Sequence, residues 1–557
     1  MISEKTTRRG FLRALGVGAT ALAAPRWAAN AAADRPLRAA QGKPNIVLMM
    51  VDDMGFSDIG CYGGEVRTPN LNKLAAGGLR FTQFYNTGRC CPTRACLMTG
   101  LYPHQAGVGH MMQDRGTDGY RGDLNDHCVT IPEVLKPAGY GTYMCGKWHV
   151  TRFTAPGGPK HNWPQQRGYD RFFGTITGAG SFWTPSTLTD GNTQITAPKG
   201  FYYTDAISDT AAKFIAEHHK ARPEDPFFLY VAYTAPHWPL HARKRDIARY
   251  ADTYTRGWDA IRAERHARMI EMGIVQKRWP ITPRDAAATP WKDVDEARRK
   301  NMALRMAVYA AQIDAVDQGV GRIVAALQKA GRLESTLVLF LADNGGCAEG
   351  GPWGFERKKG GELGSNSSFA SYGLSWANAS NTPFRRYKHW VHEGGIASPL
   401  IVHWPATVQG AGELRHQPGH LIDIMATCVD VAGATYPAKH KGKTIQPMEG
   451  RSLTPAFGNK PVQREAIYWE HEGNRAVRMG KWKLVAKGRT GPWELYDLEA
   501  DRTELNDLSA KDPERVKRMA AAWQTYAERT GVVPWPQSGR RKRKAKDGKK
   551  AQGNKKG

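Results

Sequence analysis

Four apolar segments of this 557-residue chain each end in a short polar run, and this recurrence limits the folds that the chain can adopt. Continuously apolar segments are typical of strands buried on both faces of a largely parallel sheet. Open α/β sheets place ligands beyond the carboxyl ends of their strands, so the polar runs are predicted to converge. The segments, each with its polar run, are 45–51 with 52–53, 140–144 with 146–149, 226–232 with 235–237, and 336–341 with 343–346.

Helical patterns lie between these predicted strands. The clearest covers 299–330, where apolar residues recur at helical spacing until Gly331. Alternating helices and strands predict a three-layer α/β fold, with a large and mostly parallel sheet between helices. Two long connections, the charged 241–300 and the Gly-, Ser- and aromatic-rich 348–380, are predicted to be binding lids or disordered insertions.

After Pro437 the pattern changes to short strands and turns, which a helix over 513–529 follows. This predicts a small antiparallel sheet with a C-terminal helix, packed on the main domain. We therefore predict a main domain over 44–437 and a C-terminal subdomain over 438–534. The predicted short strands cover 465–469, 475–478, 482–485 and 494–496.

The N-terminus carries two adjacent arginines, Arg8 and Arg9, ahead of a short apolar stretch over 14–24. This predicts a twin-arginine signal peptide over 1–33. A membrane anchor is disfavoured because the apolar run is shorter than the roughly 20 residues that a span needs, and no later segment is long and apolar enough. We expect the twin-arginine machinery to export the folded protein to the periplasm or the outside of the cell.

Positive charge gathers at both ends of the chain, whose formal net charge is +27. Residues 540–557 hold ten basic residues and one acidic residue, which gives +9, and residues 1–33 hold five and one, which gives +4. The tail over 535–557 is predicted to be disordered, and either binds an acidic polymer or only aids solubility. Specific nucleic-acid binding is not predicted, because no reading motif accompanies the charge.

A cysteine stands at the predicted start of a helix, where residues 90–100 read CCPTRACLMTG. Pro92 suits the first helical position and Gly100 the far end. Free backbone N–H groups and the helix dipole would then attract an anion to Cys90. The alternative is a pair of buried structural cysteines or a disulfide with Cys91. The eight cysteines are sparse for the length, so a disulfide scaffold is not predicted.

The stretch over 88–110 resembles the signature of the formylglycine-dependent sulfatases, which belong to the alkaline phosphatase-like superfamily. In that family a maturation enzyme oxidises the cysteine of the Cys-x-Pro-x-Arg core to an aldehyde, formylglycine. The resemblance implies that Cys90 is modified, whereas Cys91 occupies the variable position and stays a thiol. It also implies an alkaline phosphatase-like fold, with 44–437 as the sulfatase catalytic domain.

Four side chains of the strand tails, Asp52, Asp53, Asp343 and Asn344, offer only oxygen. Three carboxylates and an amide suit a hard divalent ion, and flexible carboxylates favour calcium over the strictly octahedral magnesium. Acidic residues after strands can also be simple caps and turn formers. In the family these positions bind calcium together with the modified cysteine, so the resemblance implies one calcium ion per subunit, held with Cys90.

Cationic side chains must surround a sulfate placed beside such a negative cluster. Lys147 and His149 stand two apart in a predicted extended stretch, so they are expected to point to the same face. Taken singly, each cation could be a surface lysine, a packed histidine or an arginine in a salt bridge. The candidates are Arg94, Lys147, His149, His237 and Lys388.

The expected reaction uses the hydrated aldehyde, in which one hydroxyl attacks sulfur and the other remains to eliminate the product. Calcium, Arg94 and Lys147 are expected to stabilise the oxyanion and hold the diol. The resemblance implies that His237 and Lys388 lie at the bridging oxygen, where one of them protonates the leaving alcohol. His149 is expected to take the proton of the remaining hydroxyl.

We therefore predict a sulfuric ester hydrolase of the arylsulfatase type that releases sulfate from aryl or carbohydrate sulfate esters. Trp353, Phe355 and Trp376 in the second long connection could contact a sugar or aryl ring, or only pack against the domain. Two alternatives stay open. One is a phosphonate monoester hydrolase or phosphodiesterase of the same fold, and the other is a non-catalytic protein that binds sulfated glycans.

Overall fold

The computed structural model describes residues 42–535, so the predicted signal peptide over 1–33 and the basic tail from residue 536 onward lie outside the described residues. The main sheet has eleven strands in the order β10, β2, β9, β8, β1, β7, β3, β4, β5 and β6, with β11 also paired to β2. The strands are β1 (Asn45–Val51), β2 (Leu79–Tyr85), β3 (Gly141–Lys147), β4 (Arg171–Thr175), β5 (Leu188–Asp190), β6 (Thr193–Gln194), β7 (Phe227–Ala232), β8 (Thr336–Ala342), β9 (Ala397–His403), β10 (Leu414–Arg415) and β11 (Gly419–His420).

Four adjacent strands, β8, β1, β7 and β3, run parallel at the centre of this sheet. Met50 of β1 pairs with Ala232 of β7 and with Leu341 of β8, and Ala232 also pairs with Gly146 of β3. The carboxyl ends of the four strands therefore lie at one edge of the sheet, which is where an open α/β sheet binds its ligands. The predicted α/β fold with a large, mostly parallel sheet is confirmed.

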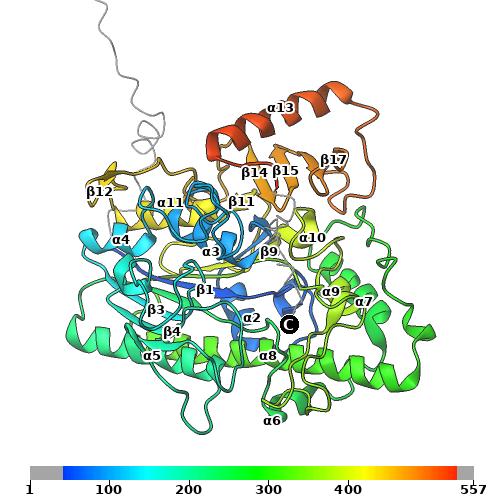
Figure 1. Cartoon of the computed structure of the whole chain (residues 1–557), viewed down its shortest axis with the longest axis horizontal. Helices are drawn as coiled ribbons and strands as arrows, with labels where there is room; N and C mark the ends of the chain where they lie inside the picture. The colour runs from blue at the N-terminus through cyan, green and yellow to red at the C-terminus, as the bar shows by residue number, and fades with distance from the viewer. Residues whose placement is uncertain (1–41, 536–557) are drawn as a thin grey trace, which may run out of the picture. The chain divides into compact units, whose positions relative to one another are not determined.

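Helices cover both faces of the sheet, which gives the three layers. Val47 and Met49 of β1 pack in one buried cluster, and Ile46 and Leu48 pack in another, because successive side chains of a strand point to opposite faces. Figure 1 shows α5 and α8 on one side of the sheet and α3 and α11 on the other. The first face is covered by α2 (Pro69–Ala76), α5 (Tyr203–Ala221) and α8 (Glu296–Lys329), and the second by α3 (Cys90–Thr99), α4 (Ile131–Leu135) and α11 (Ile422–Ala432).

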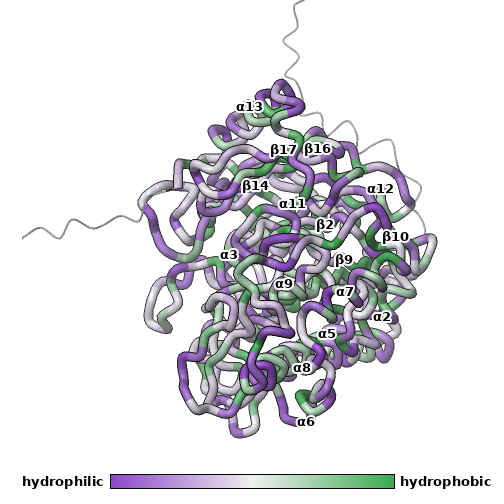
Figure 2. The backbone as a smooth tube through the Cα atoms, turned by 90° about the vertical axis from the view of Figure 1, so that its right-hand side faces the viewer, coloured by the Kyte–Doolittle hydropathy of each residue, from purple (hydrophilic) through white to green (hydrophobic). Residues whose placement is uncertain are grey.

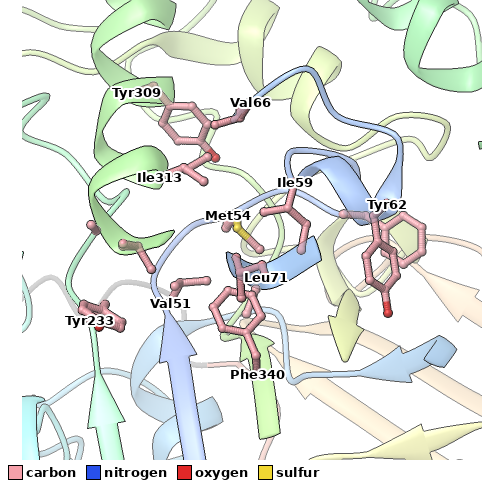
Figure 3. Packing of buried hydrophobic residues seen from close by; sticks show 14 of the residues in the cluster. Val51, Met54, Ile59, Tyr62, Val66, Leu71, Tyr233, Tyr309, Ile313 and Phe340 are labelled. Atoms are coloured by element: carbon pink, nitrogen blue, oxygen red, sulfur yellow. The ribbon is translucent and has the colours of Figure 1, made fainter. Parts of the chain in front are cut away.

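The 34-residue helix α8 supports the strand ends that carry the polar runs. Figure 3 shows Tyr309 and Ile313 of α8 near Val51 at the end of β1, in the same buried cluster as Phe340 of β8. Tyr309 also donates a hydrogen bond from its hydroxyl to the backbone oxygen of Asp53 at 3.0 Å. This packing fixes the β1 end against the helix. Among residues 42–535, no helix combines the length and apolar character that crossing a membrane requires.

The C-terminal part forms a separate four-stranded antiparallel sheet in the order β14, β15, β16 and β17. Helix α13 covers it and inserts Met519 against Val477 and Leu484. Along α13, hydrophobic and hydrophilic stretches alternate in Figure 2, as expected of a helix with one buried face. These elements fall inside the predicted subdomain over 438–534, whose boundary stays a prediction. They are β14 (Ile467–His471), β15 (Asn474–Met479), β16 (Trp482–Ala486), β17 (Glu494–Asp497) and α13 (Pro513–Thr530).

The connection over 241–300 is not the lid or disordered insertion that we predicted. It contains α6 (Lys244–Ile247) and the 15-residue α7 (Gly257–Glu271). Trp258, Ile261 and Arg265 of α7 are buried on one face, at the three- and four-residue spacing of a helix. Arg265 forms buried ion pairs with Asp58 and Glu65. One of the charges that made this segment look like an insertion, Arg265, is thus paired within the core.

The second connection, over 348–380, ends in α9 (Gly373–Ser380), which carries a fully buried Trp376. The Trp376 ring packs against the rings of Trp258 and Trp291, whose centroids lie 5.5 and 6.0 Å away. Trp353 contacts the same Trp258 ring at 6.2 Å. These two tryptophans therefore pack within the domain, and only Phe355 of the three predicted aromatic residues remains a candidate ring contact for a substrate.

Candidate active site

The four oxygen-bearing side chains meet at the ends of β1 and β8, and we call them the oxygen cluster: Asp52, Asp53, Asp343 and Asn344. All four are at most 1% exposed. Parallel pairing of Val51 with Ala342 sets the two strand ends level. The backbone N–H of Asp53 donates to Asp343 Oδ1 at 3.0 Å, and Asn344 Nδ2 donates to Asp53 Oδ1 at 2.7 Å.

Two oxygens of the oxygen cluster are orphaned. Asp52 Oδ1 and Asn344 Oδ1 are buried and accept no hydrogen bond from any residue in 42–535. A buried polar oxygen without a partner costs about 1–3 kcal/mol, and more when it is charged. Burial and the neighbouring Asp52 carboxylate also raise the pKa of Asp343 well above its usual range. Both features fit a cluster that holds a divalent cation through carboxylate and amide oxygens.

Helix α3 begins at Cys90, directly beside this cluster. Thr93, in the first turn, donates from its hydroxyl to the backbone oxygen of Asp343 at 2.6 Å, which ties the helix to the end of β8. We had predicted Pro92 at the first helical position, but it is the third helical residue, because the helix starts two residues earlier. Its missing N–H still costs nothing, since the first four N–H groups of a helix have no partner within the helix. Gly100 ends the helix with a left-handed φ of 68°, as predicted.

Two cations hold the carboxylates in place. Arg94 Nη2 lies 3.3 Å from Asp52 Oδ2 and 3.4 Å from Asp343 Oδ2, and the Lys147 ammonium pairs with Asp52 Oδ2. Arg94 Nη1 donates to the backbone oxygen of Lys147 at 3.0 Å. Burial by itself would raise the pKa of Asp52, but Lys147, His237 and Arg94 together lower it below its usual range. Asp52 is therefore a carboxylate at all ordinary pH values.

The thiol of Cys90 is activated by its surroundings. A hydrogen bond with Cys91, followed by the charge of Lys147, lowers the pKa of Cys90 well below its usual range, although burial opposes this. Cys91 Sγ also lies 3.2 Å from His149 Nε2. Burial and the Lys147 charge lower the pKa of His149 to about 4, so this imidazole is neutral near pH 7 and able to accept a proton.

His149 reaches the site through an unusual backbone conformation. We had predicted an extended stretch from Lys147 to His149. The φ of His149 is 58°, which is left-handed, so the stretch is not extended throughout. Both side chains nevertheless reach the site. A Cβ atom on Gly178 would lie 2.2 Å from the His149 ring, so only glycine leaves room for the imidazole in this place.

On the other side of the oxygen cluster, Lys388 and His237 form a second cationic group around Asp53. Lys388 Nζ lies 2.8 Å from Asp53 Oδ2 and 3.2 Å from His237 Nε2. His237 Nε2 lies 3.3 Å from the same carboxylate oxygen, and its Nδ1 lies 2.6 Å from the backbone oxygen of Trp238. That backbone oxygen can only accept, so Nδ1 carries a proton, and Nε2 faces Lys388 and Asp53. The structure thus brings all ten predicted site residues to one edge of the sheet.

Comparison with known proteins identifies the family. A family model described as "Sulfatase" matches residues 44–434. The chain belongs to the sulfatase family. A second model, described as "N-sulphoglucosamine sulphohydrolase, C-terminal", matches residues 385–526 of this sulfatase. The predicted family and the predicted sulfatase activity, hydrolysis of sulfate esters, are thereby confirmed, and a non-catalytic role is disfavoured.

Relatives resemble the sulfatase over most of its length. An uncharacterized sulfatase of Schizosaccharomyces pombe is 31% identical over 538 residues, which cover 89% of this chain and 95% of the relative. An arylsulfatase of Klebsiella aerogenes is 32% identical over 452 residues, which cover 77% and 95%. Among solved structures, Ps i-CgsB in complex with k-i-k-neocarrahexaose is 25% identical with a TM-score of 0.65, covering 88% of this chain and 94% of that chain.

Sequence reasoning missed Glu349, which lies beside Lys388 and His237 in the sulfatase site. Arg89 Nη1 lies 3.1 Å from its Oε1, Lys388 Nζ lies 3.9 Å from the same oxygen, and Trp238 donates to Oε2 at 2.8 Å. Burial would raise the pKa of Glu349, but Lys388, Arg89 and His237 lower it to about 2. Its only signal in the sequence is its place five residues after Asn344, in the segment that follows β8.

Trp238 links this group to an aromatic wall. Its ring lies 5.3 Å from Phe355 and 5.7 Å from Phe369 between centroids, and the Arg357 guanidinium lies 4.6 Å from the Phe355 ring. All three aromatic side chains are half-buried, and Arg357 is exposed. The wall therefore offers apolar ring faces and a cation next to His237.

Proposed function

We propose that this sulfatase hydrolyses aryl or carbohydrate sulfate esters with a formylglycine made from Cys90 and a bound calcium ion. The observation that carries the proposal is the position of Cys90. Its thiol lies at the N-terminus of α3, next to Arg94, Lys147 and His149 and beside the oxygen cluster. The hydrate of the aldehyde would supply the hydroxyl that attacks sulfur.

The oxygen cluster and the modified residue 90 would hold calcium. Three carboxylates, one amide oxygen and two orphaned oxygen atoms suit this ion. Bound calcium would supply a Lewis acid beside the sulfate oxygens. Arg94 and Lys147 would stabilise the negative charge that develops on those oxygens, because both cations are fixed before the substrate arrives.

The leaving alcohol would depart on the side of Lys388 and His237. The bond between sulfur and the bridging oxygen breaks, and that oxygen takes a proton from one of these two side chains. Their mutual distance of 3.2 Å allows both to contact one oxygen atom. His149, neutral near pH 7, would accept the proton of the remaining hydroxyl at residue 90, after which inorganic sulfate leaves.

Two comparisons support aryl and carbohydrate substrates. The relative from Klebsiella aerogenes is named an arylsulfatase, and the solved structure of Ps i-CgsB holds k-i-k-neocarrahexaose. In this chain, the rings of Trp238 and Phe355 beside His237 suit the face of a sugar or aryl ring. We further propose export by the twin-arginine pathway, which Arg8 and Arg9 support.

Two measurements test the proposed chemistry. The peptide that contains residue 90, isolated from the native host, should show by mass spectrometry an aldehyde in place of the Cys90 thiol. The purified enzyme should release sulfate from a nitrophenyl sulfate faster than it turns over a phosphonate monoester or a phosphodiester. A native thiol at residue 90 in active enzyme would refute the modification, and a preference for the phosphorus esters would refute sulfate as the main substrate.

A further inference from the structure

Four side chains that the proposed chemistry does not use gather close to the start of α3, and we call them the histidine cluster: His110, His389, His471 and Glu472. His110 lies in the segment after α3, His389 directly follows Lys388, and the other two lie at the turn between β14 and β15. The backbone N–H of His389 donates to Gly88 at 2.7 Å, which places the cluster beside the segment that leads to Cys90.

The Glu472 carboxylate is at the centre of this cluster. Its Oε1 lies 2.5 Å from His110 Nε2 and 3.8 Å from His471 Nε2, and its Oε2 lies 2.9 Å from His389 Nδ1. Burial would raise the pKa of Glu472, but hydrogen bonds from His110 and His389 hold it well below its usual range. The cluster therefore contains a permanent negative charge surrounded by imidazole rings.

His471 is the unexplained member. Its side chain is fully buried, and neither ring nitrogen has a hydrogen-bond partner among the described residues. Its ring stacks on His110 at 5.7 Å and meets His389 edge to face at 5.5 Å. Burial lowers the pKa of His471 well below its usual range, so the imidazole is neutral and keeps a free lone pair. A buried polar group without a partner needs an explanation, and a bound ion is one that suits a neutral imidazole.

His110 differs from the other two histidines. Arg115 Nε donates to His110 Nδ1 at 3.2 Å, so the proton of a neutral ring lies on Nε2 and points at the Glu472 carboxylate. Such a histidine orients a ligating carboxylate without binding the metal itself. This leaves His389, His471 and Glu472 as ligands, and one ligand atom from each lies within 4.8 Å of the others.

We propose that His389, His471 and Glu472 bind a divalent transition-metal ion, with Zn²⁺ as the first choice, and that His110 positions the Glu472 carboxylate. Two imidazoles and a carboxylate are a ligand set typical of zinc, whereas calcium prefers oxygen alone. Zinc is usually four-coordinate, so a water molecule would complete the set of ligands. His389 and Glu472 are 30% and 22% exposed, so the ion can enter from solvent.

The test is a calorimetric titration of zinc chloride into metal-stripped protein in excess calcium, which saturates the oxygen cluster. The protein carries Cys90→Ser and Cys91→Ser, because these two thiols and His149 form another group able to hold zinc. We expect one zinc ion to bind per chain, and cobalt in its place to give a visible absorption band. His471→Ala, His389→Ala and Glu472→Gln should each weaken zinc binding by more than about 30-fold, since even outer partners of a metal contribute 10–100-fold.

His161→Ala is the matched control, because this exposed histidine pairs with Asp123 at 2.9 Å outside the cluster. It should leave the zinc affinity unchanged. The partly exposed His389 and Glu472 keep the test decisive if the buried His471 variant fails to fold. The proposal is overturned if no saturable zinc binding occurs, or if the three variants bind zinc like their parent.

Discussion

The oxygen cluster and the histidine cluster are both buried groups of ligand-type side chains, but the chain assembles them differently. The first is made by adjacent parallel strands, whose hydrogen-bonded register sets Asp52 and Asp343 level. The second is made by three segments that are not hydrogen-bonded neighbours in any sheet: His110 and His389 lie outside helices and strands, and His471 and Glu472 lie at the end of β14 and in the turn after it. At strand ends, the hydrogen-bonded register of the sheet fixes the positions of the site residues. In loops, those positions depend on contacts between the side chains themselves.

The two clusters also differ in chemistry while lying close together. Lys388 serves the oxygen cluster, and the next residue, His389, belongs to the histidine cluster. Carboxylate and amide oxygens select a hard ion, and imidazoles select a borderline ion. The sulfatase could thus hold two different ions on either side of one short segment without exchanging them. Four predictions test this division, from the largest effect to the smallest.

The largest effect should come from Cys90, with its neighbour as the control. Cys90→Ala removes the nucleophile, and loss of a nucleophile typically costs about 10⁶-fold in kcat. Cys91→Ala removes an equally buried thiol that contacts His149, and it should retain activity within about tenfold, because Cys91 does not attack sulfur. Release of nitrophenol from nitrophenyl sulfate measures both variants. Equal losses in the two variants would contradict the assignment of Cys90.

Asp343→Ala should break the oxygen cluster alone. We expect the variant to lose bound calcium and more than about 100-fold in activity, since it loses a direct ligand. Metal analysis after dialysis, together with a rate assay, measures both losses. Zinc binding by the histidine cluster should persist in the same protein. As a control, the protein with Asp123→Ala, a change at another buried aspartate, should still bind calcium. Loss of both calcium and zinc from Asp343→Ala would argue against separate sites.

His237→Ala should produce an effect that depends on the leaving group. A nitrophenolate departs without much help, so the loss on nitrophenyl sulfate should be about tenfold or less. A sugar alcohol needs a proton, so the loss on a sugar sulfate should reach about 10²–10⁴-fold. The ratio of kcat/KM for the two substrates measures this difference. Equal losses on both would show that His237 binds the sulfate and does not assist the leaving group.

The smallest effect concerns protein stability and compares His471 with His241, a buried histidine whose two ring nitrogens both have hydrogen-bond partners. His241 Nδ1 accepts from the Phe182 N–H at 3.3 Å, and its Nε2 lies 2.9 Å from the Ser368 oxygen. Burial lowers the pKa of His241 to about 4, so the unfolded chain binds the proton more tightly. The free energy of unfolding should therefore fall as the pH drops from about 6.5 toward 4, by about 2 kcal/mol at pH 5 for this residue.

Urea unfolding at pH 7 and pH 5 measures that pH dependence. His241→Asn should unfold more easily at pH 7 but lose less stability between the two pH values than the parent. The exposed His161→Asn should keep the dependence of the parent. If His471 binds zinc, added zinc should raise the free energy of unfolding of the parent and leave that of His471→Ala unchanged, because the ion binds only the folded protein.

The sequence predicted what local patterns encode. Apolar runs with polar tails located β1, β3, β7 and β8, and the tails located the oxygen cluster together with Lys147 and His237. Residues brought in by loops had no such signal: Glu349, Arg89 and the histidine cluster depend on contacts between distant segments. The same limit explains why α7 looked like a charged insertion, since Arg265 finds its carboxylates some 200 residues away.

The complete burial of α3 limits the time during synthesis in which Cys90 is accessible. Cys90 is 2% exposed, and every residue from Cys90 to Thr99 is buried. If Cys90 is modified as we propose, we expect the modifying enzyme to reach the thiol before the chain closes around it. Strand β8, whose end contacts α3 through Asp343 and Thr93, is synthesised about 250 residues after Cys90. At roughly 5–20 residues per second, the ribosome leaves an interval of about 10–50 s for oxidation. Faster translation of the intervening region would yield more chains locked as the unreactive thiol form.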